Sequence, residues 1–111
     1  MLFVFEVTVK AGHTADVYAE AWVAASKIIQ RAPGARGTRL HRMIGDPRRL
    51  IAIASWDSKA DRDAAEAERD PRVQAILDEQ SRSVEIRVIG AFEDPDWTVL
   101  PEPTGGSRPS A

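Results

Sequence analysis

The hydrophobic period of the chain changes at Thr14, from two residues to between three and four. Before this point the run "LFVFEVTVK" is rich in β-branched and aromatic residues, which is typical of a strand. Its alternation puts one set of side chains on each face: Phe3, Phe5, Val7 and Val9, against Leu2, Val4, Glu6 and Thr8. After Thr14, a suitable N-cap, apolar residues recur with helical spacing until Pro33 and Gly34 end the pattern. The chain therefore begins with a strand followed by a helix.

The rest of the chain adds two strands, helical segments and a last strand. "GTRLHRMI" and "RLIAIASW" predict two strands, and the turn signal "GDPR" at residues 45–48 joins them into a hairpin. Ser58 and Asp61 have the spacing of a capping box, which opens an Ala-rich helix through about Arg69. Asp70 and Pro71 start a second short helix. Its inward residues are expected to be Val73, Ile76 and Leu77. The run "SVEIRVIGAFED" alternates as a fourth strand with one drier face.

The order β-α-β-β-α-β is that of ferredoxin-like domains, so we predict an α+β fold with helices on one face of an antiparallel sheet. A chain of 111 residues with 43% hydrophobic content can bury one modest core. We expect this domain to cover residues 1–95. Four of the seven prolines lie between Pro95 and Pro109, so residues 96–111 are expected to form a C-terminal arm and tail that is partly disordered.

The composition argues against several classes of protein. The chain has no Cys, which excludes disulfides, a thiolate nucleophile and Cys-based metal sites. The apolar start is too short for a signal peptide and has no basic region before it, and no run approaches the roughly 18 apolar residues of a membrane span. A net charge of −2 argues against a general nucleic-acid binder. We expect a cytoplasmic protein with no membrane or nucleic-acid partner.

The second face of the predicted sheet carries apolar residues on several strands and has no helix to cover it. An exposed apolar face of this kind favours a partner, and a homodimer with the two sheets face to face would bury it. The segment "EDPDWTVLP" is long enough to cross to such a partner. Trp97 either anchors that crossing or folds back on its own subunit.

The segments "KAGHTADVYAEAW" and "APGARGTRLHRMIGDPRRLIAIASWDSKADRDA" resemble the antibiotic biosynthesis monooxygenase family of dimeric α+β barrels, over roughly residues 1–95. The resemblance implies a homodimer with one small-molecule pocket per subunit, between the sheet and the helices. Some members oxidise aromatic polyketides without metal or flavin, others degrade haem, and others have no assigned activity. Related barrels isomerise or cyclise their substrates, so the fold by itself does not choose the reaction.

Positions at which this sequence departs from the family pattern narrow the choice of reaction. Haem-degrading members bind iron through a His, and distort the porphyrin with a Trp, on the helix after the third strand. Residues 58–80 contain neither residue type, and the position of the ligand falls near Ile76, so haem degradation is disfavoured. Quinone-forming members hold their phenolic substrate with an Asn, a Trp, a Tyr and an Arg. This chain has no Asn, and its only Tyr is Tyr18.

His41 is the best candidate for a general base, because an imidazole can take a proton near neutral pH. Alternation places it on the opposite strand face from Arg42, and a role at the edge of the sheet or in a subunit interface is the alternative. His13 is expected at the surface, and two distant His without Cys argue against a metal site. Arg42, from the only basic cluster of the chain, is a candidate for binding an anionic group of a substrate.

Three aromatic residues are candidates for binding a planar substrate. Tyr18 and Trp22 are one helical turn apart, and Trp56 ends a strand whose same face carries the small residues Ala52 and Ala54. These residues either pack in the core or line a cavity. We predict an oxidoreductase without cofactor or metal that acts on an aromatic or polyketide-like small molecule. The alternatives are a ligand-binding dimer without catalysis and an isomerase or cyclase.

Overall fold

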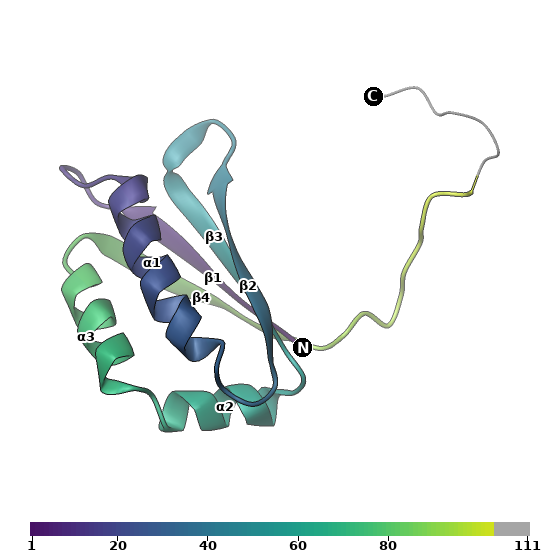
Figure 1. Ribbon diagram of the computed structural model, residues 1–111. Helices are drawn as coiled ribbons and strands as arrows, with labels where there is room; N and C mark the ends of the chain where they lie inside the picture. The colour runs from purple at the N-terminus through teal and green to yellow at the C-terminus, as the bar shows by residue number, and fades with distance from the viewer. Residues whose placement is uncertain (104–111) are drawn as a thin grey trace.

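A four-stranded antiparallel sheet forms one layer of the structure and three helices form the other (Figure 1). The computed structural model describes residues 1–103. In chain order the elements are β1 (Leu2–Val9), α1 (Ala15–Ile29), β2 (Ala35–Met43), β3 (Asp46–Trp56), α2 (Lys59–Ala67), α3 (Pro71–Gln80) and β4 (Val84–Phe92). The predicted α+β ferredoxin-like fold is confirmed.

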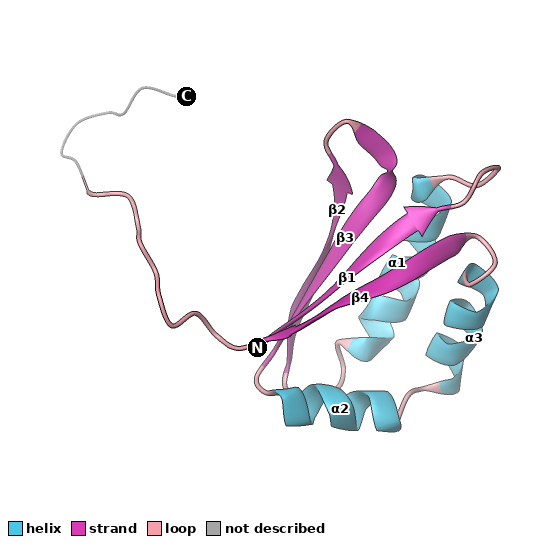
Figure 2. Cartoon of the chain, turned by 180° about the vertical axis from the view of Figure 1, so that it is seen from behind, coloured by secondary structure: helices cyan, strands magenta, loops and turns pink. Residues whose placement is uncertain are grey.

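The strands lie in the order β2-β3-β1-β4, so β1 and β3 are central. In this register Phe5 lies opposite Ala52 on β3 and Val88 on β4, and Val7 lies opposite Leu50 and Ile86. These side chains face the helices. The alternation in β1 predicted that Phe5 and Val7 share a face, and the structure shows that this face is the one beneath the helices. Figure 2 shows the other face of the sheet, over which no helix of the described chain lies.

Each helix begins at a residue whose side chain accepts a backbone hydrogen bond. The Thr14 hydroxyl accepts from the Val17 N–H at 3.3 Å, and the Ser58 hydroxyl accepts from the Asp61 N–H at 3.1 Å. The carboxylate of Asp70 accepts from the Arg72 N–H at 2.8 Å. All three helix starts were predicted from these cap residues.

The β2–β3 hairpin has a shorter turn than its sequence suggested. The pairing of Met43 with Asp46 leaves only Ile44 and Gly45 in the turn, whereas residues 45–48 were expected to form it. Gly45, the second residue of the turn, has φ of +89°, a conformation that glycine adopts without a steric cost. Asp46 and Pro47 consequently belong to β3.

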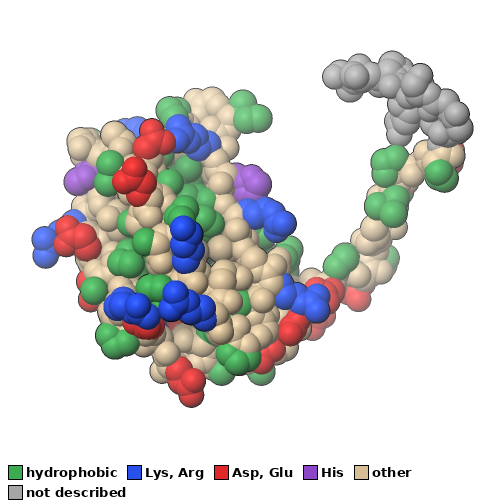
Figure 3. Space-filling view, in the orientation of Figure 1, with side chains coloured by type: hydrophobic (Ala, Val, Ile, Leu, Met, Phe, Trp, Pro, Cys, Tyr) green, Lys and Arg blue, Asp and Glu red, His purple; other side chains and the backbone are tan. Residues whose placement is uncertain are grey.

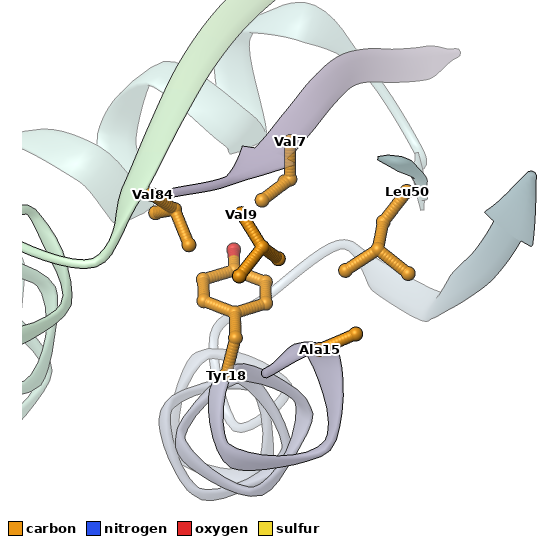
Figure 4. Packing of buried hydrophobic residues seen from close by; sticks show 6 residues of the cluster. All are labelled: Val7, Val9, Ala15, Tyr18, Leu50 and Val84. Carbon is orange, nitrogen blue, oxygen red and sulfur yellow. The ribbon is translucent and has the colours of Figure 1, made fainter. Parts of the chain in front are cut away.

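The buried core lies between the first half of α1 and the sheet (Figure 4). The ring of Tyr18 lies among the side chains of Val7, Val9 and Val84, and Ala15 lies beside Leu50. Phe5, Trp22 and Leu40 pack against this cluster. Core packing thus covers one end of the helix face, and the remainder of that face is less tightly filled.

The helix-facing side of β4 is largely exposed to solvent, whereas the sequence predicted one less exposed face for this strand. Val84 is buried, but Ile86 is 50% exposed and Val88 is 58% exposed. The physical reason is that α3 packs against α1 and leaves this edge strand uncovered.

The chain from residue 93 to residue 103 forms no helix or strand and extends away from the sheet (Figure 1). Trp97 is 89% exposed on this arm, so it does not fold back on its own subunit. Residues 104–111, the second half of the segment 96–111 that was expected to be partly disordered, lie outside the described residues. No helix within residues 1–103 is long and apolar enough to span a bilayer.

Candidate ligand cavity

A cavity of about 730 Å³ lies between the helix-facing side of the sheet and all three helices. Its volume is within the range of small-molecule sites in proteins. The sheet contributes Phe3 and Phe5 from β1, Ala54 and Trp56 from β3, and Ile86 and Val88 from β4. The helices contribute mainly Tyr18, Trp22, Ala65, Val73, Ile76 and Leu77. The walls are therefore mostly apolar.

Small side chains on facing elements leave this space open. On the sheet Ala54 lies opposite Phe3 in the register, and on the helices Ala25, Ala64 and Ala65 line the cavity. An alanine at a layer interface either allows the layers to approach or leaves a void. The exposed residues of β4 leave the cavity open to solvent at that edge of the sheet.

Tyr18 belongs both to the core and to the cavity wall. Its side chain is 4% exposed, and burial raises the pKa of its phenol to about 12. At neutral pH the group is therefore an uncharged O–H donor. The hydroxyl forms no hydrogen bond within residues 1–103, yet no fully buried side-chain oxygen or nitrogen there lacks a partner. Its oxygen must then keep some accessible surface.

Trp22 and Trp56 approach the cavity from the helix and sheet sides respectively. Trp22 is half-buried one turn after Tyr18, and Trp56 is 5% exposed at the end of β3. The backbone N–H of Trp56 donates to the Met1 carbonyl at 2.9 Å, which holds the end of β3 beside β1. The structure thus brings the three predicted aromatic residues to the wall of one cavity.

Charged residues gather where α2 borders the cavity. The guanidinium of Arg62 lies over the Phe3 ring and forms an ion pair with Glu66 at 2.5 Å. Figure 3 shows basic and acidic side chains interspersed over the helix side of the molecule, with hydrophobic surface between them. Within residues 1–103 no three His, Cys, Asp or Glu side chains are grouped so that they could hold a metal ion.

His41 and Arg42 both lie outside the cavity. His41 is exposed and pairs with Ile51, on the sheet face that points away from the helices. Arg42 lies on the helix-facing side of β2, but at the far end, where it forms an ion pair with Asp16 at the start of α1. The structure therefore does not bring the candidate base or the candidate arginine together with the three aromatic residues.

Sequence reasoning missed several residues of the cavity wall. Phe3 and Phe5 were placed on the same face of a strand without any functional role, and Asp61 was interpreted only as part of a helix start. The β1 alternation contained the signal for the two phenylalanines. Nothing local marked Asp61, because its place beside the cavity depends on how α2 lies against the sheet.

The fold and the cavity define an α+β protein with a ferredoxin-like sheet and a pocket between sheet and helices. The chain belongs to the antibiotic biosynthesis monooxygenase family, whose model matches residues 1–76. A comparison with curated proteins gives no match.

Solved structures share the fold at low sequence identity. SnoaB from Streptomyces nogalater, described as a cofactor-independent oxygenase, has a TM-score of 0.67 and 17% identity, with 86% of this chain and 96% of that chain covered. A putative antibiotic biosynthesis monooxygenase from Nitrosomonas europaea has a TM-score of 0.64 and 16% identity, with coverage of 84% and 100%. One from Deinococcus radiodurans has a TM-score of 0.64 and 14% identity, with coverage of 89% and 100%.

Proposed function

We propose that this protein binds a flat, mostly apolar small molecule in the cavity and oxidises it with O₂ without a cofactor. The observation that carries the proposal is the apolar cavity of about 730 Å³ whose wall includes Tyr18, Trp22 and Trp56. Aromatic walls favour planar ligands, because stacked and edge-to-face contacts add to the hydrophobic gain. The description of SnoaB as a cofactor-independent oxygenase supports the choice of reaction.

The proposed net reaction converts a phenol and O₂ into a quinone and water. The substrate loses four electrons and two of its hydrogens, one O₂ atom enters the quinone and the other leaves as water. No external reductant is required. Tyr18, Trp22 and Trp56 would orient the ring, and the neutral phenol of Tyr18 would donate a hydrogen bond to an oxygen of the substrate.

Oxygen uptake with candidate phenols tests this reaction. We expect O₂ consumption to match quinone formation one to one and to need the folded protein. Product formation without O₂ would instead identify an isomerase or cyclase. Saturable binding without turnover, across phenols that bind in the micromolar range, would contradict the oxygenase proposal.

A non-catalytic ligand-binding protein is the second candidate function. It is favoured by the position of His41, the predicted base, on the sheet face away from the cavity. His13, the only other His of the chain, lies exposed in the β1–α1 connection and outside the cavity wall.

We further propose that two copies associate through the open face of the sheet. Ile51 and Leu2 are 37% and 39% exposed on this face, and Val4 and Ile53 lie between them on the central strands. Glu6, the acidic residue of the central strand, accepts hydrogen bonds from Arg87 at 2.8 Å and Arg49 at 2.9 Å. The hydrogen bond from Arg87, which has the larger effect, and the one from Arg49 hold the pKa of the Glu6 carboxyl below its usual range. A face with its acidic charge balanced in this way suits burial against a second copy.

The cytoplasmic location predicted from the sequence stays a prediction.

A further inference from the structure

Four acidic residues line the cavity: Asp61, Glu66, Glu68 and Asp70. Glu66 and Asp70 form ion pairs with arginines and Glu68 is exposed, whereas Asp61 is half-buried and forms no ion pair within residues 1–103. Asp61 lies in the first turn of α2, and its backbone N–H donates to the Ser58 hydroxyl at 3.1 Å. That hydrogen bond fixes the start of the helix through the main chain and leaves the carboxylate free for another role. The side chain is half-buried and lines the cavity.

The basic residues of α2 are engaged with other carboxylates. Lys59 pairs with Asp63 at 2.6 Å, and Arg62 pairs with Glu66 at 2.5 Å while its guanidinium lies over Phe3. The Asp61 carboxylate forms no ion pair and no side-chain hydrogen bond within residues 1–103. Since no fully buried side-chain oxygen there lacks a partner, the Asp61 oxygens keep accessible surface.

The turn after α1 supports the carboxylate from one side. A Cβ atom placed on Gly34 would lie 2.5 Å from Oδ2 of Asp61, so the glycine backbone lies directly against this side chain. The turn is itself tied to the end of β3, because the Asp57 N–H donates to the Gly34 carbonyl at 2.8 Å. The carboxylate is therefore held against rigid backbone and cannot move far in that direction.

We propose that Asp61 is a specificity-determining residue that accepts a hydrogen bond from a hydroxyl group of the aromatic ligand. This inference rests on the proposed binding of a small molecule in the cavity. An ionised carboxylate only accepts hydrogen bonds, whereas Tyr18 and the two indoles offer donors. A ligand hydroxyl would replace the water that Asp61 loses when an aromatic ring fills the cavity. A ligand without a donor at that position leaves the carboxylate desolvated and unpaired, which is costly.

The test compares 1-naphthol with 1-methoxynaphthalene, which has the same ring system but no donor. Isothermal titration calorimetry on the full chain should show 1-naphthol binding at least about tenfold more tightly, the scale of a hydrogen bond to a charged group. Asp61→Ala should bring the two dissociation constants within about twofold of each other, and Asp61→Asn, which keeps the volume and a weaker acceptor, should give an intermediate ratio. Glu79→Ala is the matched control, because Glu79 is exposed on α3 and does not line the cavity.

The ratio of the two affinities separates this inference from the proposed function. Equal binding of both probes to the unmodified chain, or a preference that survives Asp61→Ala, would overturn the role of Asp61 and leave the cavity as a ligand site. A preference that disappears in Asp61→Ala but persists in Glu79→Ala supports it, even where no oxygen is consumed. Failure of both probes to bind would overturn the inference together with the proposed cavity function. Thermal unfolding would check that each variant is folded. We expect the Asp61 variants to fold, because the side chain that caps α2 is that of Ser58 and not that of Asp61.

Discussion

The guanidinium carbon of Arg62 lies 3.9 Å from the centre of the Phe3 ring, which joins α2 to β1 at the border of the cavity. A cation over an aromatic face contributes on the order of 1 kcal/mol at a partly exposed site. The accompanying ion pair with Glu66 adds little, because Glu66 is 45% exposed and solvent screens the pair.

Replacing Arg62 should therefore lower stability through the lost stacking. We expect Arg62→Ala to reduce the free energy of unfolding by about 1 kcal/mol in urea denaturation, and Arg62→Lys to recover only part of it, since lysine lacks the planar group. Arg82→Ala is the control, because Arg82 is exposed and forms no ion pair within residues 1–103. Equal effects of the Arg62 and Arg82 substitutions would argue against a stabilising contact with Phe3.

Tyr18 should titrate far above an ordinary tyrosine. It is the only Tyr of the chain, so the absorbance of tyrosinate near 295 nm reports this residue alone. We expect a midpoint near pH 12 in the folded protein and near 10 in denaturant, because burial disfavours the charged form. A folded-state midpoint at 10 would show that the phenol is solvated.

The same raised pKa makes stability depend on pH. A folded-state pKa above the unfolded value contributes stability that is fully present below pH 10 and is lost as the pH rises toward 12. The full contribution is on the order of 2–3 kcal/mol for a shift of this size. Tyr18→Phe should remove this part of the alkaline loss, which unfolding curves recorded between pH 9 and pH 12 would measure for both proteins.

Trp22 should affect both stability and ligand affinity. Because its side chain is only half-buried, Trp22→Ala should cost less than the roughly 3–5 kcal/mol of a fully buried aromatic. The same variant should weaken binding of 1-naphthol, and Trp22→Phe should keep most of the stability. Trp97→Ala is the control, since Trp97 is 89% exposed on the arm. Unchanged affinity in a folded Trp22→Ala protein would remove this residue from the proposed site.

His41 provides a test of the base predicted from the sequence. Because its side chain lies on the open face of the sheet, we expect His41→Gln to leave turnover and 1-naphthol affinity unchanged and at most to loosen subunit association. Oxygen uptake and light scattering on the same sample would measure both. A large loss of turnover with association intact would restore His41 as the base.

Association of two chains should depend on the open face. Light scattering at micromolar concentration should give twice the 12.2 kDa chain mass, and Ile51→Lys should shift the protein toward the monomer by placing a charge in the apolar contact. Ile44→Lys makes the same chemical change in the hairpin turn, where Ile44 is 99% exposed, and should leave the mass unchanged. A monomer at all concentrations would contradict the proposed dimer.

The order of strands and helices and the three helix starts followed from the sequence alone. Side-chain alternation, helical spacing and cap residues act over a few neighbouring residues, so Thr14, Ser58 and Asp70 could be assigned without a tertiary structure. The placement of Tyr18 and Trp22 on the same side of one helix also follows from their spacing of four residues, so it too could be predicted from the sequence. The hairpin turn, although also local, was placed at the wrong residues. Its position depends on the pairing of Met43 with Asp46 across the two strands, which leaves only Ile44 and Gly45 in the turn.

Only the tertiary structure decided what lies around each of these side chains. Tyr18, Trp22 and Trp56 line one cavity because α1 and the end of β3 lie against each other in the fold, and this packing joins elements that are remote in sequence. Packing of this kind also leaves Ile86 and Val88 exposed and brings Asp61 beside Gly34. His41 lies away from the cavity because the register of β2 against β3 turns Leu40 toward the helices and its neighbour to the opposite face. A short sequence window fixes backbone periodicity, but the surroundings of a side chain are contributed by distant segments, so they appear only when the chain is folded.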